Sequence, residues 1–245
     1  EAESPGDLAL EELPAEAVGE EVAPDGGLWL ALADGHQQRH TDAFMKRAGV
    51  PLKGYRSGSR RPTVGLDGVR AKVIRPQDMP RQVACGNFDL AITGRDWLRD
   101  QLYQFPRSPV RELLDLGFGR VRIVAVVHND LPVESTRDLR RLLQSGSIPV
   151  LRIATEYTNI ADMYARENHL SPYKVIPTWG ATEAFLPEDA DVLIENTETG
   201  RTLAKNNLKI IETLFESTGC LIAGTEGLAD PARARRIEQV ASVLE

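Results

Sequence analysis

Short apolar runs alternate with helix-like segments from residue 28 to the end of the chain at residue 245. Apolar runs bounded by turn residues predict buried strands. We predict strands at Leu28–Ala33, Val69–Ile74, Asp89–Thr93, Val121–Val127, Leu151–Ala154, Lys174–Ile176, Asp191–Glu195, Leu208–Phe215 and Gly219–Ala223. Because helices that connect successive strands place those strands parallel, the alternation restricts the chain to an α/β fold with largely parallel sheets.

The segments between these runs carry helix signals, such as a possible cap at Thr41 and a terminating glycine at Gly49. The predicted helices are Thr41–Ala48, Pro80–Cys85, Asp96–Gln101, Ser135–Gln144, Thr158–Glu167, Thr202–Asn206 and Pro231–Leu244, with a helical turn at Ala181–Leu186. So many strands are more than one small sheet would hold. We therefore predict two α/β lobes with a cleft between them.

The charge is unevenly distributed along the chain. Residues 1–27 hold nine of the 36 Asp and Glu residues and no Lys or Arg, so the remaining 27 acidic residues face 29 basic ones. We predict a disordered acidic tail over residues 1–27 and a nearly neutral folded body. Such a body lacks a nucleic-acid-binding charge pattern, and no apolar run approaches the ~18 residues of a membrane span. We expect neither nucleic acid nor membrane as a partner.

Cysteine usage and the N-terminus bear on the compartment. Cys85 and Cys220 are too few for a disulfide framework or a four-ligand zinc site. The N-terminus shows no basic region followed by an apolar stretch, as a signal peptide would. We therefore expect reduced thiols in a cytoplasmic protein.

The most informative local motif runs from Glu195 to Leu203 and reads ENTETGRTL. It follows a predicted strand and precedes a predicted helix, so backbone N–H groups and the helix dipole converge there. Threonine hydroxyls and a glycine suit a phosphate monoester, and a carboxylate at the start of the loop can accept ribose hydroxyls. The alternative is an ordinary capped helix start.

Three further segments could bind a ligand. Thr93 and Gly94 follow a predicted strand, at the end where α/β proteins usually bind ligands. Prolines at 76 and 80 fix a turn that presents Arg75 and Asp78. The stretch 56–61 contains three arginines that could hold a polyphosphate. The Thr93-Gly94 signal is weak by itself. The alternative for Arg75 and Asp78 is a surface ion pair, and the alternative for residues 56–61 is a solvated loop.

The four histidines show no metal-binding motif. His36 and His40 lie four residues apart, but the sequence identifies no third ligand for them. We therefore predict no metal site formed by protein side chains. No motif for a covalent nucleophile or a Walker-type phosphate loop is present either.

Several motifs, in their order along the chain, resemble those of ATP phosphoribosyltransferase, the first enzyme of histidine biosynthesis. The loop from Thr197 to Leu203, followed by residues 206–208, is similar to the family's loop for phosphoribosyl pyrophosphate (PRPP). The segments 75–80, 86–96, 115–119, 152–159 and 180–183 also match in register. The resemblance covers roughly residues 28–245, and the body's length resembles the short form of the family.

The resemblance implies an enzyme that joins N1 of ATP to C1′ of PRPP and releases pyrophosphate, with Mg²⁺ accompanying the substrates. It implies two lobes of the type II periplasmic-binding-protein kind, with the active site in the cleft. Lobe I would comprise residues 28–122 and 217–245, and lobe II residues 123–216, which include the PRPP loop.

The same resemblance suggests roles for individual residues. The PRPP site would comprise Glu195, Thr197, Glu198, Thr199, Gly200, Arg201 and Thr202. The ATP site would comprise Arg75, Asp78, Thr93, Gly94 and Tyr157. Arg60 and Arg61 are the candidates for stabilising the leaving pyrophosphate. The short form also implies a homodimer within a hetero-oligomer that contains a histidyl-tRNA-synthetase-like regulatory subunit.

The chain departs from the family pattern after its first predicted strand. The family usually has Lys-Gly-Arg there, whereas this chain has Asp34-Gly35-His36, which removes two cations from a site for anionic substrates. Glu195 also stands where an Asp is usual. Two interpretations follow. Either His36 and the arginines of residues 56–61 compensate, or the chain is a non-catalytic or degenerate paralogue, acting as a regulatory subunit or a small-molecule-binding protein.

Overall fold

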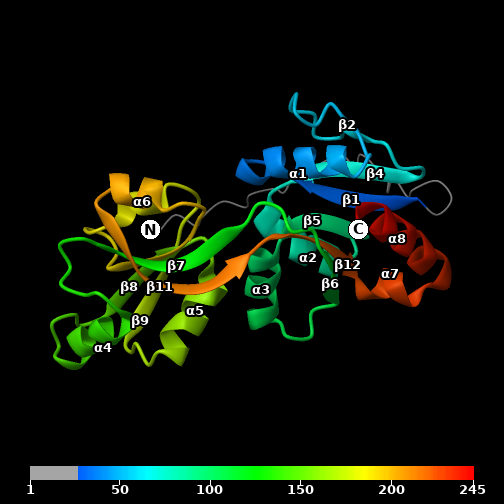
Figure 1. Ribbon diagram of the computed structural model, residues 1–245. Helices are drawn as coiled ribbons and strands as arrows, with labels where there is room; N and C mark the ends of the chain where they lie inside the picture. The colour runs from blue at the N-terminus through cyan, green and yellow to red at the C-terminus, as the bar shows by residue number, and fades with distance from the viewer. Residues whose placement is uncertain (1–26) are drawn as a thin grey trace, which may run out of the picture.

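The computed structural model describes residues 27–245, so the predicted acidic tail lies outside the described residues except for Gly27. Figure 1 shows two lobes that lie side by side, each built around a five-stranded sheet. The predicted α/β fold with two lobes and mixed, largely parallel sheets is confirmed. Among the described residues, no helix is long and apolar enough to cross a membrane.

The sheet of lobe I has the strand order β4-β1-β5-β12-β6. Its parallel part comprises β1 (Leu28–Ala33), β4 (Val69–Ile74) and β5 (Leu90–Gly94). The last two strands, β12 (Gly219–Gly224) and β6 (Val110–Asp115), add to it in antiparallel fashion. Buried aliphatic residues cover both faces of this sheet, and the central strands β5 and β12 are buried at every position.

Helices and short elements surround this sheet. They are α1 (His36–Arg47), η1 (Pro76–Asp78), α2 (Met79–Ala84), α3 (Arg95–Gln104), α7 (Thr225–Ala229) and α8 (Pro231–Leu244), with a small ribbon of β2 (Leu52–Lys53) and β3 (Thr63–Val64). Asp230 caps α8 by accepting hydrogen bonds from the N–H groups of Ala232 and Arg233 at 2.8 and 2.9 Å.

The sheet of lobe II has the order β11-β7-β10-β8-β9. Its parallel part comprises β8 (Leu151–Thr155), β9 (Tyr173–Pro177) and β10 (Val192–Thr197). The long strands β7 (Val121–His128) and β11 (Leu208–Ser217) are antiparallel to their neighbours. The helical elements of this lobe are α4 (Thr136–Gln144), α5 (Thr158–Glu167), η2 (Thr182–Phe185) and α6 (Arg201–Lys205).

The chain crosses between the lobes twice, and the two crossings lie side by side. The first leads from β6 to β7, and the second joins β11 to β12 through Thr218. Leu116 N–H donates to the carbonyl of Gly219 at 2.9 Å, and Gly219 N–H donates to the carbonyl of Phe118 at 2.8 Å. Thr218 Oγ1 also donates to Asp115 at 2.6 Å. The lobes are therefore joined by a hydrogen-bonded double strand rather than by a single linker.

The structure corrects several predicted elements. The first helix begins at His36, five residues before the predicted start, because Gly35, with φ of 65°, turns the chain directly from β1 into α1. The added residues are all polar, and His36, Gln37 and His40 among them line the cleft, so they carry no apolar periodicity. The edge strand β6 was missed because charged residues, including Arg111 and Glu112, interrupt its apolar pattern. The short elements β2, β3 and α7 were missed as well.

Candidate active site between the lobes

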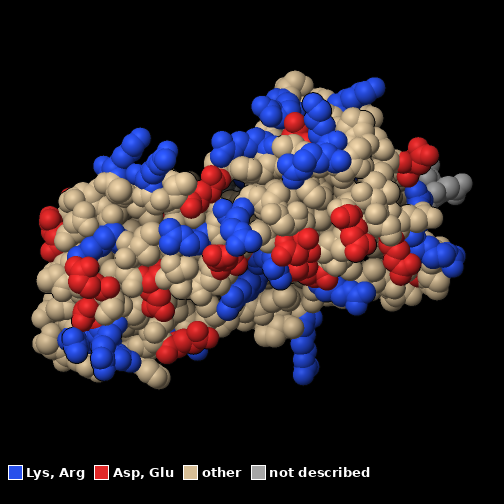
Figure 2. Space-filling model, viewed as in Figure 1, with Lys and Arg blue, Asp and Glu red and all other residues tan. Residues whose placement is uncertain are grey.

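A cavity of about 230 Å³ lies between the two lobes. Figure 2 shows a hollow at this junction, with acidic and basic side chains at its rim. Lobe I, lobe II and both crossing segments contribute to its lining. The lining residues are Asp34, Gly35, His36, Gln37, His40, Arg75, Pro76, Gln77, Gly94, Asp96 and Trp97 from lobe I, Glu156, Tyr157, Asn196 and Glu198 from lobe II, and Gly119, Val121, Ser217, Thr218 and Gly219 at the crossings.

Asp34, directly after β1, gathers two arginines at the cavity. Its Oδ2 lies 3.0 Å from Arg60 Nη1 and 3.8 Å from Arg75 Nε. The carboxylate is mostly buried, whereas about two thirds of each arginine side chain is exposed. Asp34 Oδ1 is buried without a hydrogen-bond partner. The acid that replaces a cation of the family pattern thus holds two other cations beside the cavity, and the cluster keeps a net positive charge.

The predicted phosphate loop connects β10 to α6, and of its residues 197–202 only Glu198 is among the lining residues of this cavity. Gly200 takes φ of 74°, a left-handed conformation that favours glycine. Its N–H donates to Thr197 Oγ1 at 2.9 Å, so that threonine shapes the turn. The first helical bond runs from Ala204 N–H to the carbonyl of Gly200. The N–H groups that precede Ala204 at the start of α6 have no acceptor within the helix. Such groups can bind an anion.

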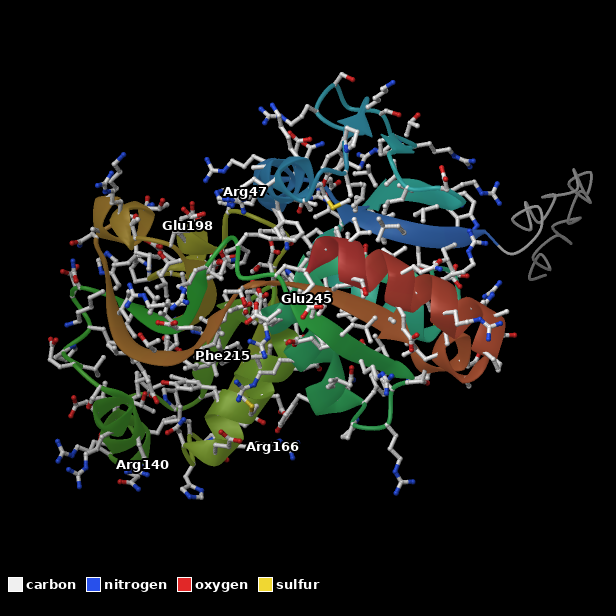
Figure 3. All side chains as sticks on the ribbon, turned by 45° about the vertical axis from the view of Figure 1, so that its right-hand side comes forward. Arg47, Arg140, Arg166, Glu198, Phe215 and Glu245 are labelled. Atoms are coloured by element: carbon white, nitrogen blue, oxygen red, sulfur yellow. The ribbon has the colours of Figure 1, made fainter. Side chains whose placement is uncertain are left out.

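Glu198, in this loop, reaches across the cleft to helix α1. Its Oε1 lies 3.3 Å from His40 Nε2, 3.5 Å from Arg39 Nη2 and 3.8 Å from His36 Nε2. Figure 3 shows Glu198 at the gap between the α6 and α1 ends of the two lobes. We call these four residues the front bridge. No local pattern predicted this contact, because Glu198 is remote along the chain from the two histidines.

A buried hydrogen-bond network, which we call the back joint, forms the deep end of the cavity. Tyr157 stacks on Trp97 with 4.1 Å between ring centroids, and its hydroxyl donates to Asp96 Oδ2 at 2.6 Å. Ser217 Oγ donates to the other oxygen of Asp96 at 2.8 Å. Burial raises the pKa of Asp96, and burial together with Asp96 raises the pKa of Tyr157. Gly94 is required beside this carboxylate, since a Cβ there would lie 2.0 Å from Asp96 Oδ1.

A second contact of the back joint caps a helix across the lobes. Asp100, on α3 of lobe I, accepts hydrogen bonds from the N–H groups of Asn159 and Ile160 at 3.1 and 2.9 Å. These residues lie in the first turn of α5 in lobe II. The N-terminus of one lobe's helix is therefore capped by a carboxylate of the other lobe.

Glu195 lies at the end of β10, between the front bridge and the back joint. Burial raises its pKa to about 7, and the neighbouring carboxylates of Glu156 and Glu183 add to this effect. Its Oε1 accepts hydrogen bonds from the backbone and side-chain nitrogens of Asn196 at 2.8 and 3.1 Å. Asn196 Nδ2 also donates to Tyr157 at 3.1 Å, which connects Glu195 to the back joint.

The remaining residues singled out in the sequence take varied positions. Arg75, Gly94 and Tyr157 line the cavity, whereas Thr93 is buried and donates its hydroxyl to the carbonyl of Pro76 at 2.9 Å. Asp78 ends η1 and is not among the lining residues. Arg61 is exposed, and its side chain is not part of the lining either.

Sequence reasoning missed His40, Asp96, Trp97, Glu156 and Asn196 as lining residues. Asn196 directly follows Glu195, and Asp96 lies two residues after Gly94, so their closeness to predicted ligand positions was a usable signal. Trp97 carried no such signal, because its partner Tyr157 belongs to the other lobe.

The fold and the cleft define a two-lobed α/β protein whose polar site lies between the lobes. Comparisons with known proteins agree. The alkanesulfonate-binding protein SsuA from Xanthomonas axonopodis pv. citri shares the fold, with a TM-score of 0.52, 12% identity and coverage of 91% of this chain and 73% of that one. A chain of the ATP phosphoribosyl transferase (HisG:HisZ) complex from Thermotoga maritima is more similar, with a TM-score of 0.68 and 20% identity over 89% of this chain and 96% of that chain.

Sequence comparisons identify the family. A model of the ATP phosphoribosyltransferase family matches residues 75–245. The ATP phosphoribosyltransferase of Chlorobaculum parvum is 35% identical over 223 residues, which cover 89% of this chain and 70% of the relative. That of Geotalea uraniireducens is 34% identical over 224 residues, covering 89% and 72%. The chain belongs to the ATP phosphoribosyltransferase family, whose members are phosphoribosyl-transferring enzymes of the first step of histidine biosynthesis. The comparisons give no support to the non-catalytic alternative.

Proposed function

We propose that the interlobe cavity is the site where the phosphoribosyl group of PRPP is transferred to N1 of ATP. The observation that carries this proposal is the arrangement of the two walls. Glu198 of the PRPP loop lines the same cavity as Arg75 and Asp34, and Arg60 contacts Asp34 beside it. A phosphate on one wall and a leaving pyrophosphate on the other would place C1′ of the ribose in the cavity.

The PRPP loop would hold the 5-phosphate through its backbone N–H groups and the hydroxyls of Thr199 and Thr202. Gly200 and Thr197 fix the turn through their own hydrogen bond, so they shape the loop. Glu195 would accept hydrogen bonds from the ribose hydroxyls in its ionised form. Because its pKa is about 7, a proton competes for this carboxylate near neutral pH.

The purine of ATP would lie against the lobe I wall, between the turn at Arg75 and the ring of Tyr157, with Gly94 leaving room for close approach. Thr93 and Asp78 would support this wall from behind, Thr93 through its hydrogen bond to the Arg75–Pro76 turn.

The chemical step requires that the two substrates are positioned and that the charge on the leaving pyrophosphate is stabilised. N1 of adenine carries no proton, so its lone pair attacks C1′ directly while the bond to pyrophosphate breaks. Arg60 would stabilise the departing charge, because its exposed guanidinium can pivot from Asp34 to a phosphate oxygen. Arg61, on the same loop, is the second candidate. This arrangement would compensate for the cations that Asp34 and His36 replace.

The site suits Mg²⁺ carried by the substrates. Burial and, to a smaller extent, the carboxylates of Glu156 and Glu183 raise the pKa of Glu195, and a nearby hard cation would favour its ionised form. Among the described residues these carboxylates do not form a cluster that could hold a metal ion. The phosphate oxygens of the substrates would therefore hold the ion, which when bound would neutralise the pyrophosphate charge.

The relatives also support a partner and a compartment. The Thermotoga maritima structure is a HisG:HisZ complex. It supports a partner of the HisZ type, a regulatory subunit similar to histidyl-tRNA synthetase. This chain would form a homodimer within a hetero-oligomer that contains this subunit. Membership in a biosynthetic family supports a cytoplasmic location. Co-expression with such a subunit, followed by size-exclusion chromatography, tests the assembly.

The activity itself is tested with the purified chain, PRPP, ATP and Mg²⁺, by following pyrophosphate release and the ultraviolet absorbance of N1-substituted adenine. We expect Arg60→Ala to lower kcat by about 100-fold or more, as is typical for loss of one group that stabilises a developing charge. Arg107→Ala is the control, because this exposed arginine lies in the turn between α3 and β6, whereas Arg60, although not a lining residue itself, contacts Asp34 of the cavity lining. Equal activity of both variants would exclude Arg60 from the site.

A further inference from the structure

The front bridge contains three side chains arranged as metal ligands. His36 and His40 lie one helical turn apart on α1, and Glu198 faces them from lobe II. One ligand atom from each residue lies within 4.8 Å of the other two. Two histidines at positions i and i+4 of a helix with a carboxylate from elsewhere form a familiar ligand set for Zn²⁺.

The two distances from Glu198 to the histidines are close to those of a metal site. Bonds of about 2.0–2.1 Å at tetrahedral angles place ligand atoms about 3.3 Å apart. Glu198 Oε1 already lies 3.3 Å from His40 Nε2 and 3.8 Å from His36 Nε2. All three side chains are at least partly exposed, so rotation can supply the remaining adjustment.

A cation already occupies the centre of this set. Arg39 Nη2 lies 3.2 Å from His36 Nε2 and 3.5 Å from Glu198 Oε1, and Arg39 Nε donates to His40 Nε2 at 3.2 Å. A guanidinium has only donors, so in these contacts Arg39 donates and each histidine Nε2 accepts. The nitrogen atoms that face Arg39 are therefore the ones that would bind a metal ion. More than half of the Arg39 side chain is exposed, so it can leave the centre for solvent.

We propose that His36, His40 and Glu198 form a binding site for a divalent transition-metal ion of the Zn²⁺ type, which replaces Arg39 and holds the two lobes together. Water would take the fourth, open position. A bound ion would fix Glu198 and with it the PRPP loop. Given the proposed function of that loop, the ion would slow exchange of PRPP and act as an inhibitor, distinct from the Mg²⁺ that accompanies the substrates.

Binding is tested first without reference to activity. Zn²⁺ is titrated into the purified chain against a chromophoric chelator, and Co²⁺ is used as a spectroscopic probe of four-coordinate geometry. We expect one site per chain. His36→Ala and His40→Ala should each weaken it by more than 10–100-fold, the loss typical of removing a group that merely supports a ligand. His128→Ala is the matched control, because His128 also lies near a carboxylate, 3.4 Å from Asp130, but outside the cavity.

Arg39→Ala provides a test in the opposite direction. Removing the competing cation should tighten Zn²⁺ binding, whereas a surface histidine pair that binds zinc without the bridge should not respond. Mg²⁺ should not displace Zn²⁺, because imidazole ligands disfavour hard cations. No Zn²⁺ binding, or equal affinity in the wild type and in His36→Ala and His40→Ala, would overturn the site.

The bridging role is tested by hydrogen exchange of residues 197–205. Saturating Zn²⁺ should slow exchange of this segment in the wild type but not in His40→Ala, and it should slow phosphoribosyl transfer in the wild type alone. Zinc binding without any change in exchange would contradict the bridging. Lack of transferase activity before zinc is added would count against the proposed function and leave the binding and exchange results to decide the metal site.

Discussion

The front bridge and the back joint connect the same two lobes by different physical means. The front bridge consists of long, partly exposed ionic side chains, namely His36, Arg39, His40 and Glu198. The back joint consists of stacked rings and fully buried hydrogen bonds around Asp96, Trp97 and Tyr157. Exposed ion pairs contribute little to stability, whereas buried, satisfied networks and ring packing contribute several kcal/mol. The back joint therefore fixes the lobes, and the front bridge can open for substrates.

Loss of the ring stack at the back joint should have the largest effect. Trp97 belongs to α3 of lobe I but packs in the core of lobe II. We expect Trp97→Ala to lower the free energy of unfolding by about 3–5 kcal/mol, measured by denaturant unfolding. Trp179→Ala is the control, because this tryptophan is 86% exposed and should unfold as the wild type does. Similar losses of unfolding free energy in both variants would contradict the assignment of the stability to the buried ring stack of the back joint.

Glu195 should make the stability of the protein depend on pH. Its pKa is raised to about 7, so the carboxylate is protonated below that value and ionised above it. In the unfolded chain it ionises near its ordinary pKa. The buried carboxylate of Glu195 therefore does not lower the free energy of unfolding below about pH 4, and it lowers it by the full amount above about pH 7. We expect Glu195→Gln to raise the free energy of unfolding by roughly 1–2 kcal/mol at pH 8, allowing for solvent screening, and by much less at pH 5.

The same residue should control the pH dependence of catalysis. If ionised Glu195 accepts the ribose hydroxyls, kcat/KM for PRPP in the wild type should fall as the pH drops below about 7. The Gln variant should have lower activity without this limb of the profile. A wild-type profile that stays flat between pH 5 and 8 would place the titrating group elsewhere.

Asp100 tests whether a helix cap can hold two lobes together. Removing its carboxylate should cost about 1 kcal/mol of unfolding free energy, as for other N-caps. Asp230→Ala is the matched control, because Asp230 caps α8 within its own lobe and should cost a similar amount. Hydrogen exchange separates the two. Asp100→Ala should expose the start of α5, in the lobe opposite the mutation, whereas Asp230→Ala should affect α8 alone.

The two contacts also show what the sequence could and could not predict. Strand and helix periodicity located the sheets, and the loop at Glu195–Thr202 was found because its strand, glycine and helix are contiguous in sequence. Contacts between lobes have no local pattern. His36 and His40 were rejected as metal ligands because Glu198, the third ligand atom, comes from a distant segment. In the sequence, Asp34 indicates a loss of positive charge from the site. The structure shows that Arg60 and Arg75, which are distant along the chain, lie beside it.

Glu198→Gln should have the smallest effect on stability, and it defines the other side of the comparison. The carboxylate meets three partners at 3.3–3.8 Å, but its own side chain and those of His36 and Arg39 are more than one third exposed. Solvent screening at such sites limits each pair to a few tenths of a kcal/mol, so we expect a change in unfolding free energy within about 0.5 kcal/mol. Raising the salt concentration should reduce even this difference. A loss above about 1.5 kcal/mol would show that the front bridge, like the back joint, holds the lobes together permanently, and the cleft would then have to admit its substrates without opening there.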